Sequence, residues 1–194
     1  CKSTGNAFLS ASCTDGCHTV LIRKQQSDDK PAAACAPASK NKTLICFSDN
    51  LDRAIATFIL ANGAAATGSK VSIFFTFWGL NVIKKKHGPA VKKTLTEKMF
   101  ANMLPKSSDN LALSKMNMMG MGSKMIRGIM KKKNIDSLES LIRQAMDNGV
   151  EFIACQMTMD MMGIKKEELL DGVTVGGVAS YMQKAEEAGV NLFI

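Results

Sequence analysis

A series of short apolar runs, separated by helical patterns, constrains the fold of this chain more than any other feature. The runs occupy residues 43–47, 70–77, 151–155 and 191–194, with a very short one at 173–175. The run 70–77 is apolar nearly throughout, as expected of a strand that is covered on both faces. Such alternation of strands and helices predicts a mostly parallel sheet with helices packed on both faces.

The helical patterns between these runs agree with this fold. Residues 51–67 follow Asn50, a candidate N-cap residue. Residues 137–148 place their leucine, isoleucine and alanine side chains on one face, and a further helix is expected at 178–188. We therefore predict a three-layer, flavodoxin-like α/β fold in which strand 43–47 lies near the centre of the sheet.

The first part of the chain has a different organisation. Residues 1–24 form a small unit, with strands expected at 7–12 and 18–23 and a hairpin turn between them. A lone hairpin is marginally stable in water, so this unit must pack against something. Residues 25–41 have the composition of a linker, and the main domain is expected to occupy 42–194.

Cys155 lies where the composition of the chain changes abruptly. It ends the apolar run in VEFIACQMTMDMMG, residues 150–163, and a short helical turn is expected to follow it. In open α/β sheets, ligands and reactive groups collect at the carboxyl ends of the strands. Free backbone N–H groups at the start of a helical turn favour a thiolate there. The alternative is a buried, inert cysteine, and the chemistry of the residues leaves both roles open.

Five other cysteines complete the set, and Cys46 is the most informative of them. It ends the first predicted strand, near the same edge of the sheet, and is a candidate resolving thiol or second sulfur site. A buried structural cysteine is the commoner role for such a residue. The remaining four do not form the disulfide framework of a small secreted domain. The cluster from Cys13 to His18 is a weak signal for a metal, so we expect neither a metal nor another cofactor.

The chain carries a formal net charge of +8, much of it in lysine runs at 84–86, 92–93 and 131–133. A basic balance can indicate nucleic acid or an acidic partner. No nucleic-acid motif and no interleaved aromatic residues accompany these lysines, so we interpret them as solvated faces and expect no nucleic acid. No apolar run reaches the roughly 18 residues that a membrane helix needs, so no integral membrane span is expected.

Residues 91–133 fit the alternating pattern least well. A helix expected at 80–86 ends before Gly88-Pro89, and the chain then enters a segment with many of its 14 methionines. Glycines within 115–130 weaken any long helix there. We interpret 91–133 as a long functional excursion. We expect 115–130 either to pack against another subunit or to form a flexible flap over Cys155.

Resemblance to a known family rests on five blocks: TLICFSDNLDRAIATFILANGAAATG, VSIFFTFWGLNVI, LSKMNMMGMGSKM, GVEFIACQMTMDMMGI and GGVASY. In this order they resemble the DsrE/DsrF/DsrH-like family, in its long subgroup that is fused to CoA-disulfide-reductase, rhodanese and TusA domains. The resemblance covers residues 42–194. The piece CKSTGNAFLS…HTVLIRK resembles the end of a TusA-like domain, without that module's sulfur-binding cysteine. A complete natural protein is therefore expected to extend further towards its amino terminus.

The resemblance implies sulfur handling, with sulfane sulfur carried as a persulfide on Cys155 and passed between protein partners. Candidate groups that stabilise the anion are the backbone N–H groups of Gln156, Met157, Thr158 and Met159, with the Thr158 hydroxyl as a further donor. The implied partners are sulfur donors and acceptors of the TusA-like or rhodanese-like kind. We expect a cytoplasmic homo-oligomer.

Two functions remain open. The first is a sulfurtransferase or sulfur-carrier domain, part of a larger oxidoreductase, that works through Cys155. The second is a non-catalytic α/β oligomerisation or ligand-binding domain of a larger disulfide reductase, in which the methionine-rich excursion makes an oligomer or membrane-surface contact. A gain of one sulfur atom on Cys155 after incubation with a sulfane-sulfur donor would favour the first.

Overall fold

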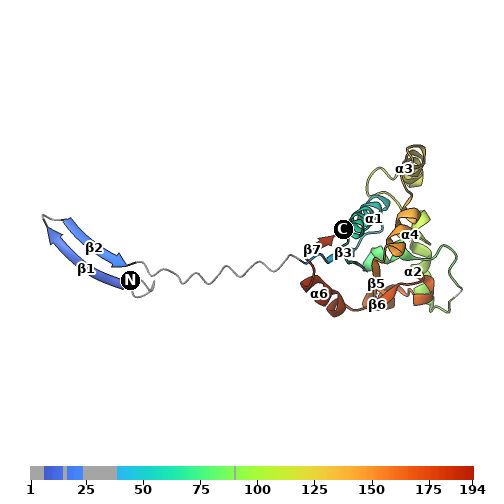
Figure 1. Cartoon of the computed structure of the whole chain (residues 1–194). Helices are drawn as coiled ribbons and strands as arrows, with labels where there is room; N and C mark the ends of the chain where they lie inside the picture. Colours follow the sequence, from blue (N-terminus) through green and yellow to red (C-terminus); the bar gives the residue numbers. More distant parts are fainter. Residues whose placement is uncertain (1–6, 15–16, 24–38, 90) are drawn as a thin grey trace. The chain divides into compact units, whose positions relative to one another are not determined.

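The computed structural model describes residues 7–14, 17–23, 39–89 and 91–194. These residues belong to two units, and the boundary between the units in the sequence lies between residues 38 and 39. In the first unit, β1 (Ala7–Thr14) and β2 (Cys17–Arg23) pair as antiparallel strands (Figure 1). The predicted hairpin is confirmed, with strands that are longer than expected. The expected linker, including Cys35, lies almost entirely outside the described residues.

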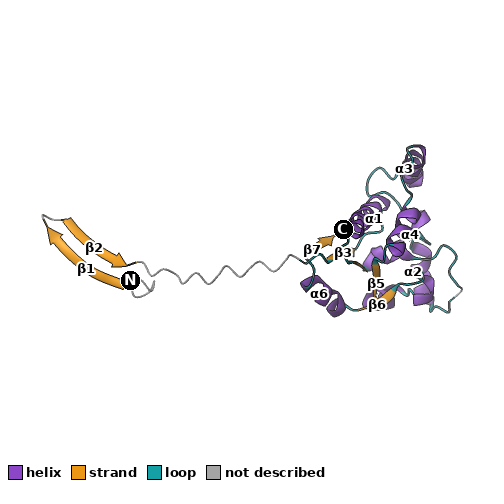
Figure 2. Ribbon diagram, in the orientation of Figure 1, coloured by secondary structure: helices purple, strands orange, loops and turns teal. Residues whose placement is uncertain are grey.

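The second unit contains a five-stranded sheet whose strands are all parallel (Figure 2). Its spatial order is β6-β5-β4-β3-β7. The predicted α/β architecture with a parallel sheet is therefore confirmed. The strands are β3 (Lys42–Cys46), β4 (Val71–Phe75), β5 (Glu151–Cys155), β6 (Thr174–Gly176) and β7 (Val190–Phe193).

The order of the strands explains where the helices lie. If the five strands are renumbered 1 to 5 along the chain, starting at β3, their spatial order is 4-3-2-1-5. The strand order in flavodoxin is 2-1-3-4-5, so the two sheets differ. Strand β3 nevertheless has a neighbouring strand on each side. The chain steps from β3 to β6 in one direction and then returns past β3 to β7. Because crossover connections are right-handed, steps in opposite directions place their helices on opposite faces. The sheet is consequently covered from both sides, as predicted.

Alternate residues of each strand contribute to two separate cores. On one face, Leu44, Phe75 and Phe152 pack against α1 (Leu51–Ala66) and α4 (Leu138–Asp147). On the other face, a smaller cluster of Phe74, Ile153 and Cys155 packs against Tyr181 of α6 (Val178–Glu186). Successive residues of a strand point to opposite faces, so adjacent residues belong to different cores.

The segment after β4 differs from the prediction. The expected strand 70–77 ends at Phe75, and the helix expected at 80–86 is instead the 3₁₀ helix η2 (Phe77–Ile83). Its close approach to β3 depends on Gly79, where a Cβ atom would lie 1.9 Å from the carbonyl oxygen of Cys46. The backbone N–H of Gly79 donates to the carbonyl of Phe47 at 2.9 Å.

The excursion between η2 and α4 is partly helical, as expected. Met119 and Gly120 interrupt its helical backbone with positive φ angles. Among the described helices, none is long and apolar enough to cross a membrane. The elements of the excursion are α2 (Leu95–Met103), η3 (Ser108–Asn110), η4 (Met118–Gly120) and α3 (Met121–Lys132).

Candidate functional site

Cys155 is the last residue of β5 and the N-cap residue of the short helix α5 (Gln156–Met162). It pairs with Gly176 at the end of β6. Cys46 likewise ends β3, and parallel strands end at the same edge of a sheet. The prediction that both cysteines lie at the carboxyl edge is therefore confirmed, and the predicted helical turn begins directly after Cys155.

The two thiols nevertheless face opposite sides of the sheet. Cys46 belongs to the core under α1, whereas Cys155 belongs to the cluster under α6. Strand β4 also lies between β3 and β5. Direct exchange between two thiols needs their side chains to point towards each other at short range. This geometry offers no support for Cys46 as a resolving thiol for Cys155 within one chain.

The environment of Cys46 suits a neutral, structural thiol. It is 1% exposed, and its Sγ donates to the carbonyl oxygen of Ser48 at 3.6 Å. Burial raises the pKa of the Cys46 thiol to about 12. A hydrogen bond with Thr57 lowers this pKa by a smaller amount, and the negative charge of Asp49 raises it. At neutral pH this thiol stays protonated, and a protonated thiol is a poor nucleophile.

Cys155 is also 1% exposed, but its surroundings differ. It shares the buried cluster on the α6 side with Phe74, Ile153 and Tyr181. The rings of Phe74 and Tyr181 lie 5.2 Å apart, and the Tyr181 hydroxyl lies 3.3 Å from Thr43 Oγ1. Tyr181 therefore ties α6 to the sheet on the side where the Cys155 thiol lies.

The four residues after Cys155 separate into different environments. Gln156 is exposed and its side-chain amide donates to Asp160 Oδ1 at 2.9 Å, while Met157 is also exposed. Met159 is buried in the core of the opposite face. The backbone N–H groups of Gln156, Met157 and Thr158 lie in the first turn of α5, where helical residues have no acceptor within the helix. The backbone, rather than these side chains, is thus what remains available to an anion.

Thr158 has a structural role that the sequence did not reveal. Its side chain is fully buried, and its Oγ1 lies 3.1 Å from Thr76 Oγ1 and accepts from the backbone N–H of Phe77 at 3.3 Å. These bonds join α5 to the end of β4. Because the hydroxyl is already engaged, its predicted role as a side-chain donor to a persulfide gains no support from this geometry.

The methionines around Cys155 do not form one wall. Met159 and Met162 are buried in the core under α1, whereas Met157 and Met161 are exposed. Sequence reasoning also missed the presence of Tyr181 in the buried cluster that contains Cys155. Only one signal could have indicated it: Tyr181 is the single tyrosine of the chain and lies within the predicted helix 178–188.

Gly176, which pairs with Cys155, allows β6 to pack closely against β5. A Cβ atom at this position would lie 2.9 Å from Cγ2 of Ile153. The next residue, Gly177, has extended backbone angles, and a Cβ atom there would meet nothing within 4 Å. The chain that borders Cys155 is thus the end of a three-residue edge strand, in which the last residue, Gly176, and the residue after it, Gly177, have no side chains.

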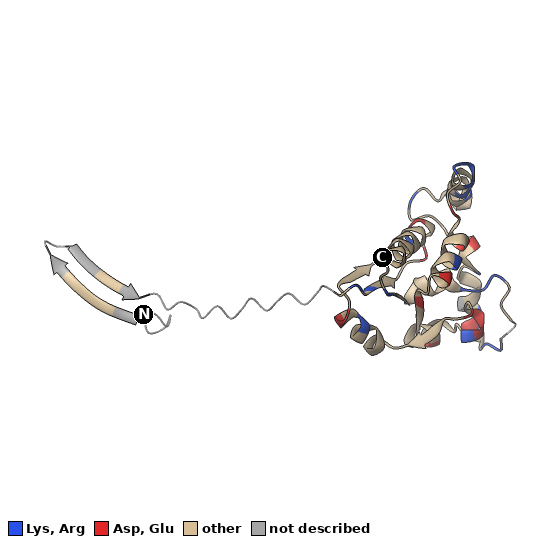
Figure 3. Ribbon diagram, viewed as in Figure 1, with Lys and Arg blue, Asp and Glu red and all other residues tan. Residues whose placement is uncertain are grey.

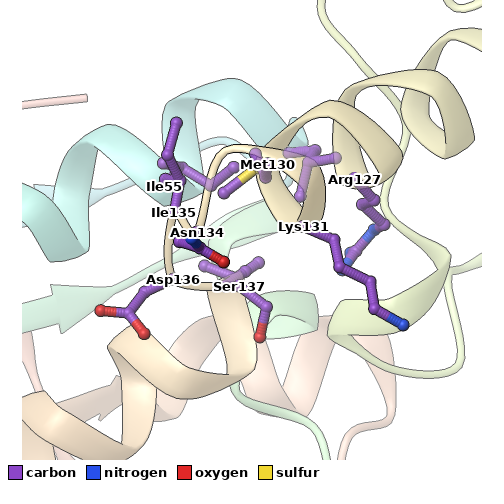
Figure 4. A pocket seen from close by; sticks show the side chains of 10 residues that line it. Ile55, Arg127, Met130, Lys131, Asn134, Ile135, Asp136 and Ser137 are labelled. Atoms are coloured by element: carbon purple, nitrogen blue, oxygen red, sulfur yellow. The ribbon is translucent and has the colours of Figure 1, made fainter.

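The methionine-rich segment does not cover Cys155. Helix α3 is held on the side of α1 and α4, where Arg127 pairs with Glu139 at 3.1 Å and donates to the carbonyl of Ser108 at 2.7 Å. A cavity of about 420 Å³ lies between these three helices, lined by residues such as Ile55, Met130 and Ile135 (Figure 4). The prediction that this segment forms a flap over Cys155 is therefore wrong.

Comparison with known proteins identifies relatives of the second unit. Residues 38–193 match the model of the DsrE/DsrF/DrsH-like family. Over 156 residues, covering 80% of this chain and 98% of each relative, the chain is 49% identical to the "Uncharacterized protein YrkE" of Bacillus subtilis. Over the same extent it is 37% identical to the "Sulfur carrier protein DsrE2" of Allochromatium vinosum.

Two solved structures also align with the chain. One is the protein of unknown function MTH1491 from Methanobacterium thermoautotrophicum, with a TM-score of 0.47 and 13% identity. The other is the ychN protein of E. coli, with a TM-score of 0.45 and 10% identity. Each alignment covers 79% of this chain and 98% of the solved chain.

Proposed function

Because the chain belongs to the DsrE/DsrF/DrsH-like family, we propose that it is a sulfur-relay protein that carries sulfane sulfur as a persulfide on Cys155. The proposal draws on the relative from Allochromatium vinosum, which is named a sulfur carrier protein and shares 37% identity over nearly its whole length. The relay takes sulfur from one protein partner and passes it to another.

The observation that carries the assignment to Cys155 is the contrast between the two thiols of the second unit. Cys46 is held protonated by burial, with a pKa of about 12, and packs under α1. Cys155 is the N-cap residue of α5, next to first-turn backbone N–H groups that have no acceptor within the helix and can donate to a sulfur anion held there. A nucleophilic carrier thiol fits the second environment and not the first.

The chemistry needs no net oxidation. The thiolate of Cys155 attacks the terminal sulfur of a donor persulfide, the donor's S–S bond breaks, and the donor leaves as a thiolate. Cys155 then holds a persulfide anion. In the second half of the relay, an acceptor thiolate attacks the outer sulfur and Cys155 is released as a thiolate. One sulfur atom moves in each step, and one S–S bond forms as another breaks.

Burial of Cys155 means that the site must open before a partner reaches it. The element that borders the thiol is the short edge strand β6, which continues through Gly176 and Gly177 into α6. Short edge strands with few packed side chains belong to the parts of a protein that open most easily. We infer that α6 and the end of β6 move away together when a partner thiol approaches.

The same proposal extends to the partners, the assembly, the location and the origin of the chain that the family resemblance implies. The partners are TusA-like or rhodanese-like proteins, the chain acts as a homo-oligomer in the cytoplasm, and it derives from the long subgroup that is fused to disulfide reductases. The β1–β2 hairpin supports a TusA-like origin for residues 1–24, because two antiparallel strands form there. A lone hairpin of this kind is marginally stable in water, so it needs a surface to pack against.

A second candidate function is a non-catalytic interaction domain of a larger disulfide reductase. The observation in its favour is that Cys155 is buried while the methionine-rich α3 region is exposed. Intact mass after incubation with glutathione persulfide separates the two functions. The relay predicts a gain of one sulfur atom that peptide mapping places on Cys155 and that dithiothreitol removes. A protein that gains no sulfur on Cys155 under these conditions would support the interaction domain instead.

A further inference from the structure

Helix α3 and the loop before it carry an exposed apolar surface that the proposed relay does not use. Three side chains form a stripe on the outer face of the helix: Met121 is 67% exposed, Met125 54% and Ile129 40%. They are spaced four residues apart, so they lie along one side of the helix. The buried residues of the helix, Gly122 and Met130, lie against the rest of the unit.

The loop extends this surface beyond the end of the helix. Met116, Met118 and Met119 are all exposed, and all three have positive φ angles of 58°, 42° and 55°. Positive φ is unfavourable for residues with side chains, and such strain persists where the surrounding structure imposes it. Here the backbone places three large apolar side chains in solvent, next to the stripe of α3.

Lysine side chains surround the apolar surface. Residues 113–135 contain five lysines and one arginine and no aspartate or glutamate, and Figure 3 shows the positive charge on α3. Arg127 is paired with Glu139, whereas the five lysines make no ion pair with any residue that the structure describes. An uncompensated positive charge of this size favours an anionic partner. The lysines are Lys115, Lys124, Lys131, Lys132 and Lys133.

We propose that this surface, consisting of α3 and residues 115–120, binds peripherally to an anionic lipid bilayer. An exposed apolar stripe bordered by lysines is the pattern of a helix that lies in the plane of the bilayer interface. Its methionines and isoleucine enter the boundary between headgroups and acyl chains, and the lysines contact the headgroups. Figure 1 shows α3 at the margin of the second unit.

The position of Lys132 favours a bilayer over a groove in a protein. It follows Met121 by about three helical turns and therefore lies on the same side of α3 as the apolar stripe. A closed groove would bury its ammonium group without a partner, at a high cost in free energy. At a bilayer surface the long side chain extends to the phosphate level while its methylene groups stay among the apolar residues.

A second copy of the chain fits this surface less well. A symmetric contact through α3 would bring two clusters of unpaired lysines against each other, and like charges across an interface oppose association. A bilayer that contains anionic lipid supplies the opposite charge. Each lysine near such a surface strengthens binding by about fivefold, so the group acts together.

Flotation of the full chain with vesicles tests the proposal. Binding is expected to vesicles that combine phosphatidylcholine with phosphatidylglycerol, to weaken at high salt, and to be slight with phosphatidylcholine alone. Met121→Glu/Met125→Glu should weaken binding by about tenfold or more, because it places two carboxylates in the inserted face. Lys131→Gln/Lys132→Gln/Lys133→Gln should weaken it by roughly a hundredfold at low salt.

A matched control is available on α2. Met99 and Met103 are also spaced four residues apart and are 59% and 79% exposed. Met99→Glu/Met103→Glu should bind vesicles like the unchanged chain, and so should Cys155→Ser. Equal loss in the α2 and α3 methionine variants would overturn the proposal, as would absence of binding at low salt. A third outcome would assign the surface to a second copy of the chain. In that case the unchanged chain would not bind vesicles, and light scattering would show that it self-associates whereas the α3 methionine variant does not.

Discussion

Replacement of Tyr181 by alanine should open the Cys155 site without unfolding the chain. Tyr181 is nearly fully buried, its ring lies 5.2 Å from that of Phe74, and its hydroxyl lies 3.3 Å from Thr43 Oγ1. A buried tyrosine removes about 150–200 Å² of surface from water, which contributes about 4 kcal/mol at about 25 cal/mol per Å². Alanine retains a small part of this, so the closed state loses about 3 kcal/mol.

The assay is the rate at which a limiting alkylating reagent labels each cysteine, read by peptide mass. When labelling requires opening, the rate follows the equilibrium population of the open form, so a loss of about 3 kcal/mol speeds labelling of Cys155 by about a hundredfold. Tyr181→Phe keeps the ring and should raise the rate only a few-fold, because a single hydrogen bond contributes about 1 kcal/mol.

Cys46 reports whether the opening is local. It lies on the other face of the sheet, under α1, and becomes accessible only when that core opens. Its labelling rate should change far less than that of Cys155 in Tyr181→Ala. Equal acceleration of both cysteines would mean that the whole domain has been destabilised. An unchanged rate at Cys155 would show that α6 does not control access, which would refute the reasoning.

Three further predictions concern stability, measured by chemical denaturation. Thr158→Val should lower the free energy of unfolding by about 1–3 kcal/mol, because it leaves the part-buried Phe77 N–H without its acceptor. Gly163→Ala should lower the free energy of unfolding by more than about 1 kcal/mol, because the φ angle at Gly163 is 63° and the added Cβ atom would meet Glu97. Gly177→Ala, where the backbone is extended and the space is open, should leave the free energy of unfolding nearly unchanged. Burial lowers the pKa of Lys84 to about 8 from 10.5, so the folded state binds fewer protons than the unfolded state between these values and stability rises with pH there. Lys84→Met should remove that rise, and an unchanged pH dependence would contradict the assignment.

The strands and helices with a regular apolar pattern could be predicted from the sequence alone. Strand β5 and helix α4 were predicted almost to the residue, because an unbroken apolar run and an amphipathic face each leave few alternatives. The prediction was wrong at η2, where a helix had been expected three residues later. The reason is tertiary: Gly79 packs directly on the backbone of β3, and no local pattern reveals that contact.

The candidate site was predictable in position but not in orientation. The end of a strand followed by a helical turn placed both Cys46 and Cys155 at the carboxyl edge. Which face each thiol occupies depends on the register of its strand, and a shift of one residue reverses it. The burial of Cys155 in one cluster with Tyr181 likewise depends on the return crossover to β7, which the sequence pattern does not specify.

The sulfur-carrier role of Cys155 is tested most directly by the rate of persulfide formation in three chains: unchanged, Cys155→Ser and Cys46→Ser. Each is mixed with glutathione persulfide and sampled by intact mass over time. The account predicts that Cys155→Ser gains no sulfur on the second unit, while Cys46→Ser is less stable but loads Cys155 at the unchanged rate. Normal loading of the second unit in Cys155→Ser, with the sulfur mapped to Cys46, would contradict the account.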